Sequence, residues 1–351
     1  MKEFTYTALP VRVVFGAGAL EKLGEEIARL GAQRALVLCT PEQRAVGEDV
    51  ARRIGSRAAG VYDQAVMHVP IETAEAARRA AAELSADCCI AIGGGSTTGL
   101  GKAIALTSSL PILAIPTTFA GSEMTPLQGI TIAGVKKMMR DPRMLPRTVI
   151  YDPTLLLTLP AGLAGPSGIN GIAHAVEALY AQDANPVTSL MAEESIRALA
   201  QSLPVVVREP RNVDALGDAL HGAWLAGLCL GTVGMALHHK LCHALGGTFN
   251  LPHAQTHTVI LPHAVRYNAA AAPEAMRRIG RALGVSDPAS GLYELARTLG
   301  APVALRDIGM PADGLDRAAD VAMNNAYWNP RPLERDAIRE LLQAAWKGCR
   351  P

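Results

Sequence analysis

Histidines are concentrated in one segment of the chain. Residues 221–268 contain seven histidines, Lys240 and Arg266, and no aspartate or glutamate. Five histidines have spacings that could place them at a shared site: His174, His239, His243, His253 and His257. His239 and His243 are four residues apart, as are His253 and His257, so each pair lies on one face if its segment is helical. Any one of them could be a packing or capping residue. Together they favour a neutral to positive pocket for an anionic substrate.

A glycine-rich turn follows an apolar stretch at residues 88–92. Its sequence is Gly93, Gly94, Gly95, Ser96 and Thr97, and a helical pattern continues beyond it. Glycines let the backbone approach a phosphate closely, and the start of a helix offers free N–H groups. Three glycines can also form an ordinary tight turn. Their position between a buried strand and a helix favours dinucleotide binding.

Other candidate cofactor contacts carry hydroxyl or amino groups. The turn is not G-x-G-x-x-G, and Thr40, not an acid, follows the apolar run 35–39. Without a negative charge there, NADPH as well as NADH could be accepted. A polar loop at residues 116–125 follows the next predicted strand. The further predicted contacts are Thr40, Thr117, Thr118, Ser122 and Lys102. The alternatives are hydroxyls that bond their own backbone and a lysine that caps its helix.

Composition excludes several classes of protein. The 351 residues suffice for two domains, and 49% of them are hydrophobic. A net charge of +1 without a basic run argues against a nucleic-acid partner. The amino terminus has no apolar signal core, and the most apolar run, 222–237, is too short for a membrane span. Six cysteines without paired or metal-binding spacing indicate a reducing, cytoplasmic location.

The first part of the chain alternates between predicted strands and helices. We expect strands at residues 11–15, 35–39, 88–92, 111–115 and 147–151. Helical patterns at 19–30 and 71–84, with a helix start at Thr40 and Pro41, predict a doubly wound, mainly parallel, Rossmann-like α/β domain. A hairpin is expected at residues 129–139, with its turn at 133–134.

The rest of the chain is predicted to be all-α. Prolines at 153, 160 and 166 punctuate a connector, so we place the domains at 1–156 and 157–351. Predicted helices cover residues 169–180, 186–203, 213–230, 235–245, 273–283, 291–299, 314–323 and 334–347.

The order of these motifs resembles the iron-containing alcohol dehydrogenase superfamily, which has the dehydroquinate synthase-like fold, over nearly the whole chain. The resemblance is carried by residues 14–20, 93–96, 116–118 and 151–153 and by His174, His239 and His253. Longer strings are similar to those of the maleylacetate reductases within that superfamily: residues 93–100, 117–126, 238–243, 246–253 and 327–332. The resemblance implies a homodimer.

The metal site of the superfamily differs in this chain. Members that use a divalent metal bind it with one aspartate and three histidines, and the resemblance puts His174, His239 and His253 at the histidine positions. Asn170 stands at the aspartate position, and a neutral amide is a poor ligand for a dication. Resemblance to maleylacetate reductases implies catalysis without metal. Three imidazoles could still hold Zn²⁺, so a metal-dependent alcohol dehydrogenase is the alternative.

The resemblance also implies a reaction, in which NADH or NADPH reduces the C=C bond of maleylacetate to give 3-oxoadipate during the degradation of aromatic compounds. The small dianionic keto-acid needs a cationic pocket and a proton source. His243, whose family position lies beside the nicotinamide, is the predicted proton donor. His174, His239 and His253 would bind substrate oxygens. Further predicted substrate contacts are Asn170, Lys240, His257 and Tyr327. Competing hypotheses are a zinc-dependent sugar-phosphate lyase and a non-catalytic nucleotide-binding module.

Overall fold

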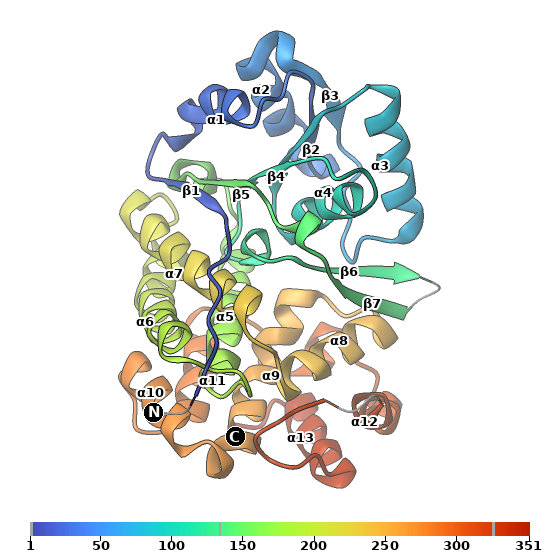
Figure 1. Ribbon diagram of the computed structural model, residues 1–351. Helices are drawn as coiled ribbons and strands as arrows, with labels where there is room; N and C mark the ends of the chain where they lie inside the picture. The colour runs from blue at the N-terminus through green and yellow to red at the C-terminus, as the bar shows by residue number, and fades with distance from the viewer. Residues whose placement is uncertain (1–2, 133–134, 325–326) are drawn as a thin grey trace. The chain divides into compact units, whose positions relative to one another are not determined.

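The computed structural model describes residues 3–132, 135–324 and 327–351 (Figure 1). It divides into two compact units, one of Ala8–Thr158 and one of Leu159–Pro351 together with the segment before Ala8. The division falls two residues after the predicted position. The segment before Ala8 belongs to the second unit, although the prediction assigned it to the first.

The first unit is built on a sheet of six parallel strands in the order β1-β8-β5-β4-β2-β3. These strands are β1 (Arg12–Phe15), β2 (Ala35–Leu38), β3 (Ala58–Tyr62), β4 (Cys88–Gly93), β5 (Ile112–Pro116) and β8 (Thr148–Tyr151). The predicted α/β class is confirmed. β3 was not predicted, because its half-buried Ala-Ala-Gly-Val-Tyr sequence at the edge of the sheet lacks a dense apolar run.

Side chains alternate between the two faces of this sheet, and a helical layer covers each face. On one face Ala35 and Val37 pack with residues of α1 (Leu23–Arg29) and α2 (Arg44–Ile54). On the other face Leu36 and Leu38 pack with residues of α3 (Ile71–Glu83) and α4 (Gly95–Ser108). Burial on both faces explains why β2 and β4 are apolar throughout.

The connections of the sheet change direction between β2 and β4. The chain leaves β2 towards β3 on one side and leaves β4 towards β5 on the other. In open α/β sheets, ligands bind at the carboxyl ends of the strands where such a reversal occurs. Thr40 and the three glycines follow these two strand ends, so topology places the predicted cofactor residues at the reversal.

A separate two-stranded ribbon lies within the same unit. β6 (Leu127–Ile132) and β7 (Val135–Arg140) pair antiparallel. This confirms the predicted hairpin. The two predicted turn residues, Ala133 and Gly134, lie outside the described residues.

The second unit is helical. Its helices are α5 (Ala161–Leu179), α6 (Pro186–Arg208), α7 (Val213–Thr232), α8 (Leu237–Phe249), α9 (His253–Asn268), α10 (Pro273–Leu283), α11 (Pro288–Thr298), α12 (Leu315–Met323) and α13 (Arg335–Lys347). α5 begins earlier than predicted and contains Pro166, which was assigned to the connector. α9 was not predicted. It is buried from Thr256 to Val265, so it shows no amphipathic stripe to mark it as a helix.

No single helix among the described residues is long and apolar enough to cross a membrane, although α7 and α8 pass that test jointly as a pair bent by 94°. All six cysteines are free, and five of them are buried.

Candidate active site

The glycine turn presents mainly backbone atoms at the start of α4. Gly93 ends β4 with φ 146°, and an added Cβ there would lie 2.5 Å from Oγ1 of Thr97. Gly94 is the N-cap of α4, and Gly95, the first helical residue, is exposed. The turn therefore requires glycine for both conformation and space. It leaves the amino end of a 14-residue helix open to an anion.

Hydroxyl groups surround this turn. Thr97 is fully buried, and its Oγ1 has no hydrogen-bond partner among the described residues. Thr118 lies 3.1 Å from the position of a Cβ on Gly94. Oγ1 of Thr117 accepts a 2.9 Å hydrogen bond from Nε2 of Gln43. These groups, with Ser96 at the second position of α4, form a neutral cradle suited to a phosphate.

Gln43 was not predicted. It ends the 3-10 turn Pro41–Gln43 that follows β2, and its Oε1 would lie 2.8 Å from a Cβ on Gly93. Its position one turn after the end of a buried strand was the signal that could have identified it. Thr40 was expected to cap that turn, but its side chain makes no capping hydrogen bond. It is half-buried where β2 ends.

Lys102 is placed differently from the prediction. The sequence put it near the cofactor phosphates or at a helix cap, whereas the structure buries it completely. Its Nζ donates to the carbonyl oxygens of Ser122 (2.6 Å) and Leu127 (2.8 Å) and to Oγ1 of Thr125 (2.8 Å). Burial lowers the pKa of this amine to about 7, against the opposing effect of the Glu123 carboxylate. Lys102 therefore ties residues 122–127 to α4, and it meets Ser122 through the carbonyl oxygen at 2.6 Å and the hydroxyl at 3.4 Å.

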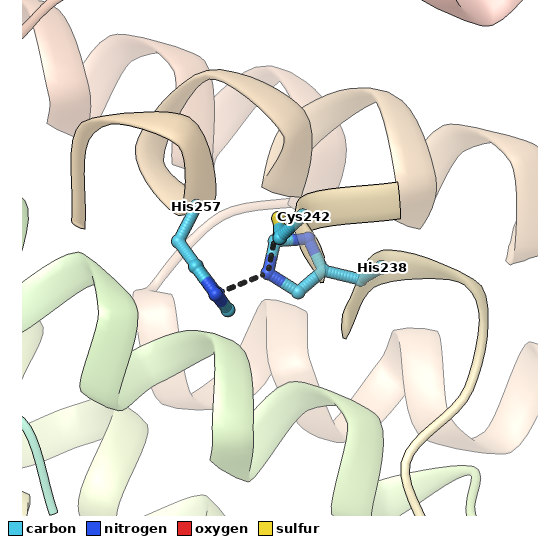
Figure 2. A group of neighbouring side chains, drawn as sticks. All are labelled: His238, Cys242 and His257. Carbon is cyan, nitrogen blue, oxygen red and sulfur yellow. Dashed lines mark hydrogen bonds between the residues drawn. The ribbon is translucent and has the colours of Figure 1, made fainter. Parts of the chain in front are cut away.

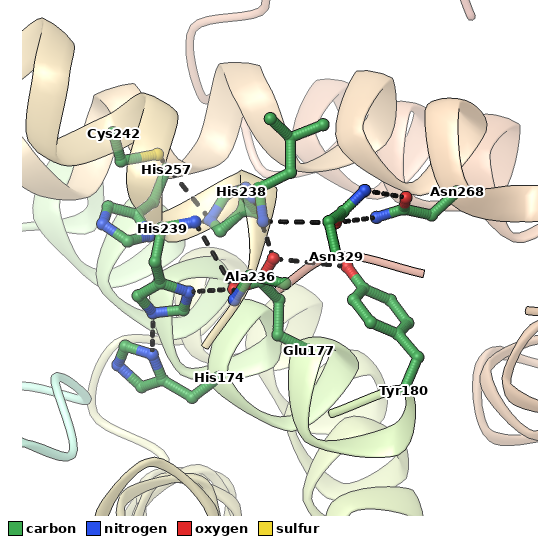
Figure 3. A network of polar contacts seen from close by, with 11 residues as sticks. His174, Glu177, Tyr180, Ala236, His238, His239, Cys242, His257, Asn268 and Asn329 are labelled. Atoms are coloured by element: carbon green, nitrogen blue, oxygen red, sulfur yellow. Dashed lines mark hydrogen bonds and ion pairs between the residues drawn. The ribbon is translucent and has the colours of Figure 1, made fainter. Parts of the chain in front are cut away.

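The predicted histidines come together in the helical unit, and Figure 3 shows three of them, His174, His239 and His257. His174 comes from α5, His239 and His243 from α8, and His253 and His257 from α9. The ring centroids of His239 and His257 are 5.0 Å apart, and those of His253 and His257 are 4.4 Å apart. The rings of His243 and His253 are stacked at 6.5 Å. The structure thus brings all five predicted histidines into one cluster, which we call the histidine cluster.

A buried carboxylate that the sequence did not suggest lies beside this cluster. Glu177 is fully buried one turn after His174 on α5, and its Oε2 lies 2.8 Å from Nδ1 of His239. Nε2 of His239 in turn lies 2.7 Å from Nδ1 of His174. The absence of acid between residues 221 and 268 does not make the cluster acid-free, because a different helix supplies the carboxylate. The spacing of His174 and Glu177 by three residues was the available signal.

A second group of donors shares His257 with the histidine cluster (Figure 2). Nε2 of His238 lies 2.9 Å from Nδ1 of His257 and 3.7 Å from Sγ of Cys242. One donor atom of each of these residues lies within 4.8 Å of the other two. The group could hold a soft metal ion if the two imidazole nitrogens moved apart to about 3.3 Å. Burial, followed by neighbouring histidines, lowers the pKa of both His238 and His257 well below 6.5, so both rings are neutral at neutral pH.

The other predicted substrate contacts differ in exposure. Asn170 is buried on α5, and its Oδ1 has no hydrogen-bond partner within the described part of the chain. Lys240 and Tyr327 are half-buried, with Nζ of the lysine 5.2 Å from the centroid of the tyrosine ring. Tyr327 also lines a hollow of about 440 Å³ together with Trp328 and Arg331.

Asn329 fixes the segment that carries Tyr327. Its side chain exchanges hydrogen bonds of 2.8 and 3.1 Å with the side chain of Asn268. Its Oδ1 also accepts from the backbone N–H of Leu237, at the start of α8. The turn at Asn329 and Pro330 is therefore bonded to α8 and α9.

Two nitrogens of the histidine cluster lie closer together than two ligands of one bound cation. His174 and His239 direct nitrogens at each other at 2.7 Å, whereas two nitrogen ligands on tetrahedral Zn²⁺ are about 3.3 Å apart. Asn170 supplies no charge. The carboxylate of Glu177 is already engaged by Nδ1 of His239 and by backbone N–H groups of Ala236 and His238. The arrangement is that of a hydrogen-bonded histidine pair supported by a carboxylate.

Comparison with known proteins identifies the class. Residues 10–153 match the family model described as iron-containing alcohol dehydrogenase, and residues 166–346 match that of the carboxyl-terminal part of the Fe-containing alcohol dehydrogenase family. The chain belongs to this family and is an oxidoreductase that uses a nicotinamide cofactor.

Within the family, the chain is similar to maleylacetate reductases. It is 61% identical to the maleylacetate reductase of Burkholderia cepacia over the full length of both chains. The crystal structure of maleylacetate reductase from Agrobacterium tumefaciens has a TM-score of 0.95 at 51% identity and covers 100% of both chains. The structure of 1,3-propanediol oxidoreductase is 27% identical, with a TM-score of 0.91 over 98% of this chain and 100% of that one.

Proposed function

We propose that this chain reduces the C=C bond of maleylacetate to give 3-oxoadipate, with NADH or NADPH as hydride donor and without a metal. Full-length identity of 61% to a maleylacetate reductase carries the proposal. The histidine cluster, with the neutral Asn170 where the family's metal-binding members have an aspartate, supports its metal-free part.

The reaction adds a hydride and then a proton. The nicotinamide, when bound, supplies a hydride to the alkene carbon β to the ketone, and the electrons of the C=C bond move onto the ketone oxygen. The protein must then stabilise an enolate and protonate its α carbon. Because the alkene is conjugated to the ketone, hydrogen-bond donors can stabilise this charge, and a Lewis acid is less necessary than in alcohol oxidation.

Residues of the histidine cluster would divide these tasks. His174, His239 and His253 would bind the carboxylate or ketone oxygens, and Asn170 would donate an amide hydrogen bond. Lys240, on α8 and beside Tyr327, would add positive charge for a dianion.

His243 would act as the proton donor. It is half-buried, whereas His257 is fully buried and kept neutral by its low pKa. A general acid must regain its proton from solvent after each turnover, so a half-buried histidine fits this role better than a fully buried one.

The coenzyme loop supports NADPH as well as NADH. Thr40 and Pro41, not an acidic residue, directly follow β2, so no carboxylate at those two positions opposes a 2′-phosphate. We further propose a homodimer in the cytoplasm, with neither nucleic acid nor membrane as partner. The six free cysteines suit a reducing compartment.

The test is oxidation of NADH, followed at 340 nm, by EDTA-treated protein with maleylacetate, with bound metal measured in parallel. Turnover by metal-free protein supports the proposal. Activity that disappears with EDTA and returns with Zn²⁺ or Fe²⁺ contradicts the metal-free part and points to a metal-dependent alcohol dehydrogenase.

Two variants locate any metal that is found. Asn170→Asp restores an anionic ligand at the family position and should raise the affinity of the histidine cluster for Zn²⁺. Cys242→Ser removes the thiol from the second group of His238, Cys242 and His257. Metal lost in Cys242→Ser but unaffected by Asn170→Asp lies at that second group, and unchanged turnover by this variant would show that the metal is not needed for the reaction.

A further inference from the structure

We infer that Glu177 is a positioning residue: its carboxylate keeps a proton on Nδ1 of His239, so that Nε2 of His239 shares a single proton with Nδ1 of His174. This inference rests on the proposed function for its effect on catalysis, but the proton arrangement itself can be tested without a substrate.

The surroundings of Glu177 are those of an ionised carboxylate. Its Oε1 accepts from the backbone N–H of His238 at 2.8 Å, and its Oε2 accepts from that of Ala236 at 2.8 Å. The N–H of His239 lies 3.4 Å from the same Oε2. These donors form the amino end of α8, where a helix has free N–H groups and a partial positive charge. A carboxylate from α5 thus caps α8 and offsets its own loss of water.

This environment determines which nitrogen of His239 carries hydrogen. An ionised carboxylate can only accept hydrogen bonds, so Nδ1 of His239, at 2.8 Å from Oε2, must be the donor. Its other nitrogen, Nε2, is 2.7 Å from Nδ1 of His174, and only one proton can lie between them. Glu177 therefore fixes both the orientation of the His239 ring and the order of protons along the three groups (Figure 3).

For catalysis, the consequence is that the ring of His239 keeps one orientation. Without the carboxylate, the His239 ring could turn over or change tautomer, and His174 would lose its defined partner. Groups that orient a catalytic or ligating histidine in this way typically change activity about 10–100-fold when they are replaced. Both nitrogens of His239 are engaged in this chain, so a substrate oxygen would meet the pair at Nε2 of His174, which donates when the pair carries one further proton. Glu177 itself touches neither substrate nor cofactor.

The direct test uses ¹⁵N-histidine NMR on the full-length wild-type protein. The His239 resonance, assigned by its loss in His239→Gln, should show a protonated Nδ1 coupled to a strongly hydrogen-bonded proton. A His239 ring protonated only on Nε2 would overturn the inference. Because no substrate is used, a protonated Nδ1 in a protein that does not reduce maleylacetate would contradict the proposed function alone.

The matching kinetic test compares two variants. Glu177→Gln should lower kcat for maleylacetate about 10–100-fold while leaving the Kd for NADH unchanged, and should alter the His239 resonance. Tyr180→Phe removes a hydroxyl that lies 3.5 Å from Oε1 of Glu177 and also bonds to the side chain of Asn268, and it should keep activity within about 2-fold of wild type. A folded Glu177→Gln protein with wild-type kcat would contradict the inference. If that variant does not fold, the wild-type spectrum decides alone.

Discussion

The glycine turn of the α/β unit and the histidine cluster of the helical unit are two different kinds of binding site. At the turn, consecutive residues between β4 and α4 present backbone N–H groups at the start of a helix. In the cluster, side chains from α5, α8 and α9 meet, and the contact that orders them spans 62 residues of sequence, from Glu177 to His239.

This difference explains what each site tolerates. A backbone site depends on local conformation, so it is disrupted by adding atoms where glycine is needed. A side-chain cluster depends on which groups face each other, so it is disrupted by removing a donor or a charge. Substitutions at the two sites should therefore have different effects on turnover and on coenzyme binding.

Replacing His243 by alanine should affect the cluster most. We expect kcat with maleylacetate to fall about 10²–10⁴-fold, because the enolate would lose its general acid. Binding of NADH should be unchanged, since the glycine turn is intact. Steady-state kinetics and coenzyme titration provide the comparison. A wild-type rate would remove His243 from the mechanism.

Gly93→Ala should weaken the binding of NADH, which His243→Ala leaves unchanged. The new Cβ would lie 2.5 Å from Oγ1 of Thr97 at a φ that disfavours side chains, and this strain costs about 1–3 kcal/mol. The Kd for NADH, measured by fluorescence titration, should rise at least about 10-fold.

Gly16→Ala is the matched control for this variant. Gly16 has a similar φ of 140° but nothing within 4 Å of the added atom. It should show the conformational cost without the loss of coenzyme binding. Equal Kd values in the two alanine variants would show that close approach of the Gly93 backbone is not required.

Acid should destabilise the helical unit through buried histidine. Burial lowers the pKa of His263 to about 4, against about 6.5 in the unfolded chain. Since the unfolded state binds the proton first, stability is lost as the pH falls below 6.5. The loss amounts to about 2 kcal/mol at pH 5.

His263→Gln should lack this part of the pH dependence. Urea unfolding at pH 8 and pH 5 can be followed by tryptophan fluorescence, because Trp224, Trp328 and Trp346 all belong to the helical unit. An unchanged difference between the two pH values in the variant would show that His263 does not contribute.

The smallest effect is expected at Lys240. Its half-buried ammonium group should contribute about 1 kcal/mol to binding a dianion, so Lys240→Gln should raise KM for maleylacetate roughly 5-fold at unchanged kcat. The effect should decrease at high salt. A KM that does not depend on Lys240 at low salt would place the dianion elsewhere.

Prediction from sequence succeeded where a local pattern determines structure. The apolar runs of β2 and β4 and the glycines after β4 signal a parallel sheet with a binding turn, because each feature lies within a few residues. The half-buried edge strand β3 and the buried helix α9 were missed for the converse reason, since neither has the usual periodic pattern.

The sequence did not predict which side chains contact each other. Lys102 follows the glycine turn closely enough to suggest a phosphate contact, yet its amine is used by residues 122–127. Nε2 of Gln43 donates to Thr117, 74 residues away, because the strand order brings the end of β2 near the end of β5. Neither contact has a local signal.

The sequence alone determined the α/β and helical division, the glycine turn and the five histidines, because strand burial, helix spacing and backbone freedom are properties of neighbouring residues. Tertiary structure decided the charge within the cluster. Only the packing of α5 and of α8 against α9 brings Glu177 to His239, and only that contact determines which histidine nitrogen carries a proton.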